Sequence, residues 1–252
     1  MNRFILITLL LIVTIHFNVI GQVLPPIQCD RPDQTECPFI VPKNHFQMET
    51  GFAFEQTDSK TQSLFHPSIL SKFGVNDNFE LRLITESETV NSDTLSISGL
   101  NPVKIGFKVK LTDGKGIVPR TSFIGHLSVP YFASENFTAT YYAPTFRFTM
   151  QYELTEKMNL GINLGSEWDG ESTEPEFIYT LTTGYSFTEK LGGYIELYGF
   201  APQNSQSDHR FDCGLGCLLN PNILLDISGG VGLSDISPNY YLALGFSFRL
   251  KD

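Results

Sequence analysis

The chain has 252 residues, of which 41% are hydrophobic and 13% aromatic, and a formal net charge of −10. The acidic charge, and the absence of a basic stripe that could neutralise phosphates, argue against nucleic-acid binding. Neutral or cationic small molecules remain as possible ligands. After residue 22 no apolar run approaches the roughly 18 residues of a membrane-spanning helix. The rest of the chain could therefore cross a membrane only as a closed β-sheet.

Residues 1–21 have the profile of a signal peptide. One basic residue, Arg3, precedes an apolar run over residues 4–13, and a weakly polar stretch ends at Gly21. The alternative is a membrane anchor, but Thr14 and His16 interrupt the run, which is shorter than the roughly 20 residues that span a bilayer. We therefore expect cleavage near Gly21 and export of the mature chain to the bacterial outer membrane.

Residues 22–43 are polar and rich in proline, which keeps the backbone extended. They form either a periplasmic tail or a plug that folds into the barrel predicted below. In a plug, Asp30, Arg31 and Asp33 would meet lumen charges of opposite sign. The charge and the proline content motivate this hypothesis, and both alternatives stay open from the sequence.

The four cysteines fall into two pairs. Cys29 and Cys37 flank a short polar loop, where an oxidising periplasm would permit a disulfide, although spacing alone does not fix connectivity. On a strand that rises about 3.3 Å per residue, Cys213 and Cys217 share a face but stand too far apart to bridge. No histidine lies at a matching metal-ligand spacing. We expect these two to be small, outward-facing apolar residues.

Alternation of apolar and polar residues recurs in segment after segment and predicts β-strands. In the last segment Leu242, Leu244 and Phe246 alternate with Ala243 and Gly245. About twelve strands follow from such patterns, and several reach the roughly 9 to 11 residues that a tilted strand needs to cross hydrocarbon. Their ranges are 45–55, 63–74, 79–88, 103–111, 119–132, 142–154, 159–168, 177–187, 191–200, 210–219, 222–233 and 240–250.

The polar face distinguishes a membrane barrel from a soluble sandwich. A sandwich would expose Lys, Glu and Thr to solvent throughout, but here small residues mix with isolated charges, as at Gly161, Asn163 and Gly165. Tight links near 75–78, 155–158, 188–190 and 220–222 alternate with longer polar ones near 89–99, 133–138, 169–175 and 201–209. Both features favour an all-β, antiparallel up-and-down transmembrane barrel over residues 44–252, with short periplasmic turns and longer outer loops.

Three segments carry a resemblance to a known family: residues 29–36 with Asp30, Arg31 and Asp33, residues 41–51, and the strand, turn and charged return strand over residues 72–83. Their order resembles the Bacteroidetes barrel proteins grouped with the outer-membrane transporters of the phenol meta-degradation pathway. Cys29 and Cys37 are not part of that pattern. The resemblance implies a barrel with a transport role, and it supplies no established functional residues and no substrate.

The alternation places charges of both signs in the lumen. They either pair across a closed lumen or line a solute path, with Lys104, Lys108, Arg120 and Arg147 as a positive wall. The lumen-lining candidates are Glu49, Glu80, Arg82, Lys104, Lys108, Arg120, His126, Arg147, Glu153 and Arg249, and the same face holds Glu86, Glu196, Asp212 and Asp226.

Enzymatic activity is not expected. His126 shares a strand face with Ser122 and Ser128, as in lipid-modifying barrels, but no nucleophile-elbow motif accompanies them. There is no Walker, dinucleotide, EF-hand or zinc motif, so no cofactor or metal is predicted. The acidic residues around Trp168 form either a divalent-cation site in an outer loop or a solvated acidic loop, and the second interpretation is favoured.

We therefore predict a monomeric outer-membrane transporter or channel for a small solute, hydrophobic or aromatic solutes included. The alternative is a structural or adhesion barrel with a closed lumen. The expected partners are outer-membrane lipids, the barrel-assembly machinery during biogenesis, and a solute that the sequence does not name.

Overall fold

The computed structural model describes residues 24–251, and the predicted signal peptide lies outside them. Within this range the chain forms one sheet of long antiparallel strands joined by hairpins, with one 3-10 turn, η1 (Glu135–Phe137). The strands are β1 (His45–Gln56), β2 (Gln62–Asn76), β3 (Phe79–Asn91), β4 (Ser96–Leu100), β5 (Val103–Lys115), β6 (Val118–Val129), β7 (Ala143–Glu153), β8 (Met158–Glu167), β9 (Glu176–Ser186), β10 (Leu191–Pro202), β11 (Asp208–Asn220), β12 (Ile223–Gly232) and β13 (Tyr240–Lys251).

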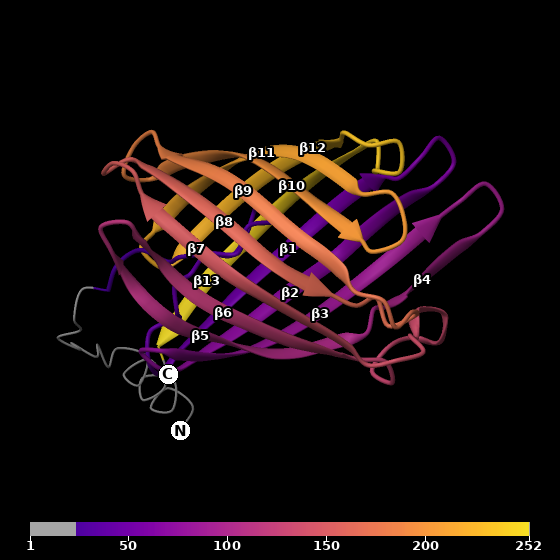
Figure 1. The fold of residues 1–252 in the computed structure, drawn as a ribbon, viewed down its shortest axis with the longest axis horizontal. Coiled ribbons are helices and arrows are strands. Elements are labelled where there is room, and N and C mark those ends of the chain that lie inside the picture. The colour runs from indigo at the N-terminus through magenta and orange to yellow at the C-terminus, as the bar shows by residue number, and fades with distance from the viewer. Residues whose placement is uncertain (1–23, 252) are drawn as a thin grey trace, which may run out of the picture.

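The sheet closes into a barrel because the first and last strands pair. β1 and β13 are antiparallel over their whole length, with His45 opposite Lys251 and Gln56 opposite Tyr240. β3 pairs with β5 near its start and with the short β4 near its end, so β4 extends an outer hairpin and leaves twelve strands in the wall of the described barrel (Figure 1). The predicted twelve-strand antiparallel barrel is confirmed.

The two ends of the barrel differ in their connections. Tight turns join β2 to β3, β7 to β8, β9 to β10 and β11 to β12 at one end, while the longer loops after β6, β8, β10 and β12 gather at the other (Figure 1). Both described chain ends lie at the tight-turn end, where the amide of Ile27 donates to the carbonyl of Pro221 and that of Arg249 to Asn222. This arrangement is typical of outer-membrane barrels, in which the tight turns are periplasmic.

The outside of the barrel is apolar and the inside is polar. Leu242 and Leu244 on β13 are 60% and 58% exposed, whereas Ser247 and Arg249 on the other face of the same strand are buried. Because side chains alternate across a strand, the exposed apolar residues form a band that suits contact with lipid tails. Among the described residues, no helix is long and apolar enough to span a bilayer.

Candidate functional site

Residues 25–41, called the plug below, run through the inside of the barrel before β1 begins. Arg249 on β13 donates to the carbonyl of Pro25 at 2.8 Å, and Ser122 on β6 donates to that of Pro38 at 2.6 Å. The amide of Val41 donates to the Glu80 carboxylate at 2.7 Å. The plug backbone thus finds partners on the barrel wall in place of water, as buried polar groups require.

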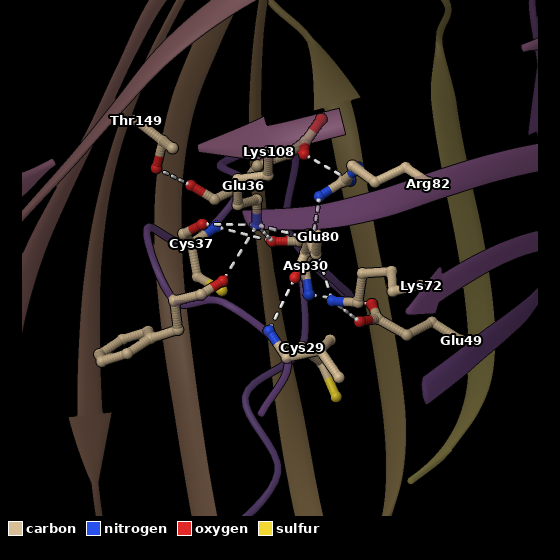
Figure 2. Close-up of polar contacts among 12 residues, drawn as sticks. Cys29, Asp30, Glu36, Cys37, Glu49, Lys72, Glu80, Arg82, Lys108 and Thr149 are labelled. Atoms are coloured by element: carbon tan, nitrogen blue, oxygen red, sulfur yellow. Dashed lines mark hydrogen bonds and ion pairs between the residues drawn. The ribbon is translucent and has the colours of Figure 1, made fainter. Parts of the chain in front are cut away.

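Asp30 is the most strongly bound residue of the plug. Its carboxylate accepts hydrogen bonds from Lys72 on β2 at 3.0 Å, Arg82 on β3 at 3.0 Å and Lys108 on β5 at 2.9 Å (Figure 2). Burial disfavours its charged form, but the three cations outweigh burial and hold the pKa of Asp30 well below its usual value. Asp30 therefore stays ionised and fixes the plug to one side of the wall.

Further carboxylates complete this ion-pair cluster, which we define as Asp30, Glu36, Glu49, Lys72, Glu80, Arg82 and Lys108. Glu36 of the plug lies 2.7 Å from Arg82, Glu80 lies 3.1 Å from the same guanidinium, and Glu49 pairs with Lys72. Burial opposes ionisation of Glu36, but Arg82 lowers its pKa. Four carboxylates thus surround three buried cations, and removing one partner of a buried ion pair is strongly destabilising.

The opposite side of the plug contacts β8 to β10 through neutral and acidic groups. The amide of Gln34 donates to Glu196 at 2.7 Å, the amide of Glu36 donates to Asn163 at 2.8 Å, and the Thr35 hydroxyl bonds to Glu196 and to Thr180. No ion pair joins Glu196 to another described residue. Residues 34–36 are thus held to β8–β10 by hydrogen bonds, and one ion pair, between Arg31 and Asp226 on β12, adds to them.

Glycines on the inner face let the plug approach the wall closely. A Cβ on Gly74 would overlap the carbonyl oxygens of Val41 and Pro42, and one on Gly51 would overlap the guanidinium of Arg31. On Gly106 it would overlap the ring of His126. The small residues that the sequence places on the polar face are therefore the positions where plug or lumen side chains fill the space.

Most of the predicted lumen residues are buried inside the barrel, but they do not form one surface. Glu49, Glu80, Arg82, Lys108, His126, Arg147 and Arg249 are each at most 8% exposed. Lys104 and Glu153 are exposed, at opposite ends of the lumen, and Arg120 lies beside Asp113 and over the ring of Phe39. Of the plug candidates, Arg31 pairs with Asp226 at 3.0 Å, whereas Asp33 forms no ion pair with another residue of the range 24–251.

The four residues predicted as a positive wall have separate surroundings in this structure. Lys108 binds Asp30, Arg120 lies 3.3 Å from Asp113, and Arg147 donates to the carbonyl of Gln34 at 3.1 Å. Lys104 lines the outer mouth. Carboxylates and carbonyl groups are interleaved with these cations, so their fields are locally cancelled.

All four cysteines are free, so the structure does not contain the disulfide considered between Cys29 and Cys37. Each lies in its own environment: the Gln47 amide approaches the Cys29 sulfur at 3.9 Å, while the Cys37 carbonyl accepts from Lys108 at 2.8 Å (Figure 2). Burial raises the pKa of both thiols above the usual value. Protonated, buried thiols are poor nucleophiles and behave as small apolar side chains.

Sequence reasoning missed Lys72, which is 1% exposed and central to the ion-pair cluster. The register of β2 shifts between Phe65 and Ser68, so Ser63 faces inward before the bulge and Lys72 after it. A bulge adds one residue to the strand, so that odd-numbered residues face inward before it and even-numbered residues face inward after it. Pro67, which cannot donate to the sheet, was the signal in the sequence for such a break. Glu36 was also missed.

The histidine considered for catalysis has a structural contact. Nε2 of His126 accepts from Nε of Arg82 at 3.1 Å, and Ser122 donates to the plug. Within the described residues, neither Ser122 nor Ser128 is hydrogen-bonded to the His126 imidazole, whereas an activated nucleophile would be bonded to its base. No group of three or more His, Cys, Asp or Glu in residues 24–251 is arranged to hold a metal ion.

Two cavities lie on either side of the plug. The outer vestibule has a volume of about 630 Å³ and six acidic lining residues against one lysine, Lys104. The inner cavity, of about 210 Å³, is lined by plug residues Asp33, Thr35 and Cys37 and by the periplasmic ends of β7 to β11. The acidic residues of the vestibule lining are Glu86, Glu167, Asp169, Glu174, Glu176 and Asp208.

Fold and lumen define the class of protein: a twelve-strand outer-membrane-type β-barrel whose N-terminal segment fills the lumen. The chain belongs to the family described as "Putative MetA-pathway of phenol degradation", whose model matches residues 29–250. This confirms the family resemblance of the sequence. No curated protein matches the chain in sequence.

Two solved structures share the fold at low sequence identity. The COG4313 outer membrane channel from Pseudomonas putida F1 is 13% identical, with a TM-score of 0.69 over 88% of this chain and 100% of that one. The NanC porin is 14% identical, with a TM-score of 0.52 over 81% of this chain and 100% of that one.

Proposed function

We propose that this protein is an outer-membrane channel for a small solute, closed in the described state by its plug. The observation that carries the proposal is the arrangement of the lumen: a vestibule of about 630 Å³ lies at the outer mouth, and plug residues such as Asp33 and Thr35 line a second cavity of about 210 Å³ nearer the tight-turn end. A barrel whose only task was structural could fill its lumen with side chains, as small barrels do.

The proposed setting is the outer membrane, reached through a signal peptide and the barrel-assembly machinery. The apolar outer band supports contact with lipid, and the closed β1–β13 seam supports a monomer, since no strand edge of the wall is left unpaired. The similarity to the COG4313 channel and the family membership agree with this setting.

The charge of the vestibule supports a neutral or cationic solute rather than an anionic one. Six carboxylates face one lysine. Among residues 24–251, only two of the six have a cation within 4 Å: Asp208 lies beside Arg210 and Glu167 beside Arg147. A cleft lined by one sign of charge concentrates solutes of the opposite sign.

Liposome swelling tests the proposal. Vesicles that contain the protein are diluted into isotonic solutions of neutral, anionic, cationic and aromatic solutes of similar size. We expect swelling with neutral and cationic solutes and slower swelling with anions. The assay is run at acidic and at alkaline pH, and swelling rates equal to those of protein-free vesicles for every solute at every pH would refute a transport function.

A structural or adhesion barrel with a permanently closed lumen is the second candidate. The ion-pair cluster favours it, because every charged group of the cluster has a partner within 4 Å and Lys72, Lys108, Glu49 and Glu80 are at most 1% exposed. The swelling experiment separates the two functions, because a permanently closed lumen passes no solute.

A further inference from the structure

Residues 31–35 form a loop whose two ends are fastened to one side chain. Asp30 and Glu36, which flank this plug loop, both bind the guanidinium of Arg82, at 3.0 and 2.7 Å. From this base the loop crosses the lumen to the wall of β9 to β12, where Thr35 meets Thr180 and Arg31 meets Asp226. Asp30 and Glu36 anchor the base, so the loop can leave the far wall, breaking the Arg31–Asp226 ion pair and the Thr35 hydrogen bonds, without freeing the rest of the plug.

Where the loop meets β10 and β11, three carboxyl groups come together. Glu196 and Asp212 are direct partners in the β10–β11 register and are each 1% exposed. The loop brings Asp33 to this pair, because the amide of the next residue, Gln34, donates to Glu196 at 2.7 Å and the Thr35 hydroxyl also donates to Glu196. None of the three forms an ion pair within residues 24–251. Oδ1 of Asp212 is buried without a hydrogen-bond partner. This carboxyl cluster differs from the ion-pair cluster, in which every carboxylate has a cation within 4 Å.

The groups around the cluster supply few positive charges. β9 presents Thr180 and Thr182, and β10 presents the hydroxyls of Tyr194 and Tyr198. From β11 Arg210 is engaged with Asp208 and Glu55, and on β12 Asp226 is paired with Arg31. Tyr241 on β13 donates to Asp212. Ionising all three carboxyl groups this close together in a buried site is unfavourable in free energy.

We propose that the plug loop is a proton-operated gate: it rests on β10 while the carboxyl cluster of Asp33, Glu196 and Asp212 holds a proton, and it leaves that wall when the cluster becomes fully ionised. Departure of Asp33 and Thr35 then joins the inner cavity, which they line, to the vestibule. The proposal rests on the proposed channel function and adds its control.

The direction of the pH response follows from Asp33. Burial, followed by the nearby Glu196 carboxyl, raises the pKa of Asp33 well above its usual value when the loop is docked. The docked state therefore binds more protons than the undocked state. Raising the pH through this range favours the undocked state, and lowering it favours the docked state.

Single-channel recording of the full-length protein as a function of pH is the test. We expect the open probability to rise as the pH increases above the usual carboxylate range, by up to about tenfold per pH unit, the limit for release of one proton. Asp33→Asn and Glu196→Gln remove a charge from the cluster, so each variant should stay closed at the upper pH. Asp235→Asn, in an exposed outer loop, is the matched control and should behave as the unaltered protein.

The outcomes separate the gate from the channel. Conductance that is independent of pH, or that responds equally in Glu196→Gln, would overturn the gate and leave the channel standing. Absence of conductance in all variants at every pH would overturn both. Heat-modifiable migration of each variant on gels shows whether the barrel has folded. If Glu196→Gln fails to fold, Asp33→Asn still tests the gate, because it alters the plug and not the wall.

Discussion

Asp30 shows what one residue contributes to this protein. It is 6% exposed and is held by three cations from three strands, Lys72, Lys108 and Arg82. The sequence predicted Asp30 as a plug residue because it lies in a charged, proline-rich segment. The alternation did not predict which cations bind it, because the bulge in β2 moves Lys72 to the inner face, and Pro67 marks a break in the strand without specifying how the register shifts.

Replacing Asp30 with asparagine should release the plug from β2, β3 and β5. Three buried cations would lose a shared anion, and breaking a buried ion pair costs about 3 to 5 kcal/mol. We expect larger and noisier single-channel currents from Asp30→Asn, while Asp58→Asn, in an exposed loop, should change nothing. Unchanged currents in Asp30→Asn would show that the cluster does not hold the plug.

Acid should have a similar effect on the unaltered protein. The cations lower the pKa of Asp30, so its ionised form stabilises the plug above the usual carboxylate value of about 4. That stabilisation is lost as the pH falls through the lowered value. We expect the anchored end of the plug to loosen only in strong acid, well below the range in which the plug loop responds. Proteolysis of the plug, followed against pH, measures this.

At the scale of the element, the fit between the plug and the wall depends on glycine. The alternation predicted which residues of each strand face inward, and the small residues there suggested a crowded lumen. The occupant could not be deduced, because a small residue leaves room equally for water, a side chain or another segment. At Gly74 the occupant is the backbone of Val41 and Pro42.

Gly74→Ala tests this close approach. The added methyl group would overlap two plug carbonyl oxygens, and overpacking of this kind costs about 1 to 3 kcal/mol. Gly216→Ala is the matched control, since its nearest neighbour would be a Leu224 methyl group at 3.6 Å, an ordinary contact. We expect a lower unfolding midpoint in urea for Gly74→Ala only. Equal midpoints would mean that the plug does not press against β2.

For the whole molecule, the fold was predictable and the state of the lumen was not. Period-two alternation over twelve segments, together with turns that are short at one end, specifies a barrel. Few other arrangements of strands are consistent with both features. Whether residues 25–41 enter that barrel depends on long-range pairing between Asp30, Glu36 and strands far along the chain. Such pairings leave no periodic signal in the sequence.

The acidic outer mouth gives the molecule a preference for cations. In a salt gradient across a planar bilayer, the reversal potential of the open channel should have the sign of cation selectivity. Glu174→Gln with Asp169→Asn should reduce it, because both residues line the vestibule without an ion pair within 4 Å among the described residues. Glu189→Gln, on a turn at the other end, is the control. Anion selectivity would contradict this description of the mouth.

The central claim is that a plug, not the barrel wall, closes this lumen. The most direct measurement is single-channel conductance in planar bilayers of the full-length protein and of a variant that lacks residues 25–40. We predict small or rare openings for the full-length protein and a large, steady conductance for the variant. Equal conductance in the two proteins, or none in a correctly folded variant, would contradict the claim.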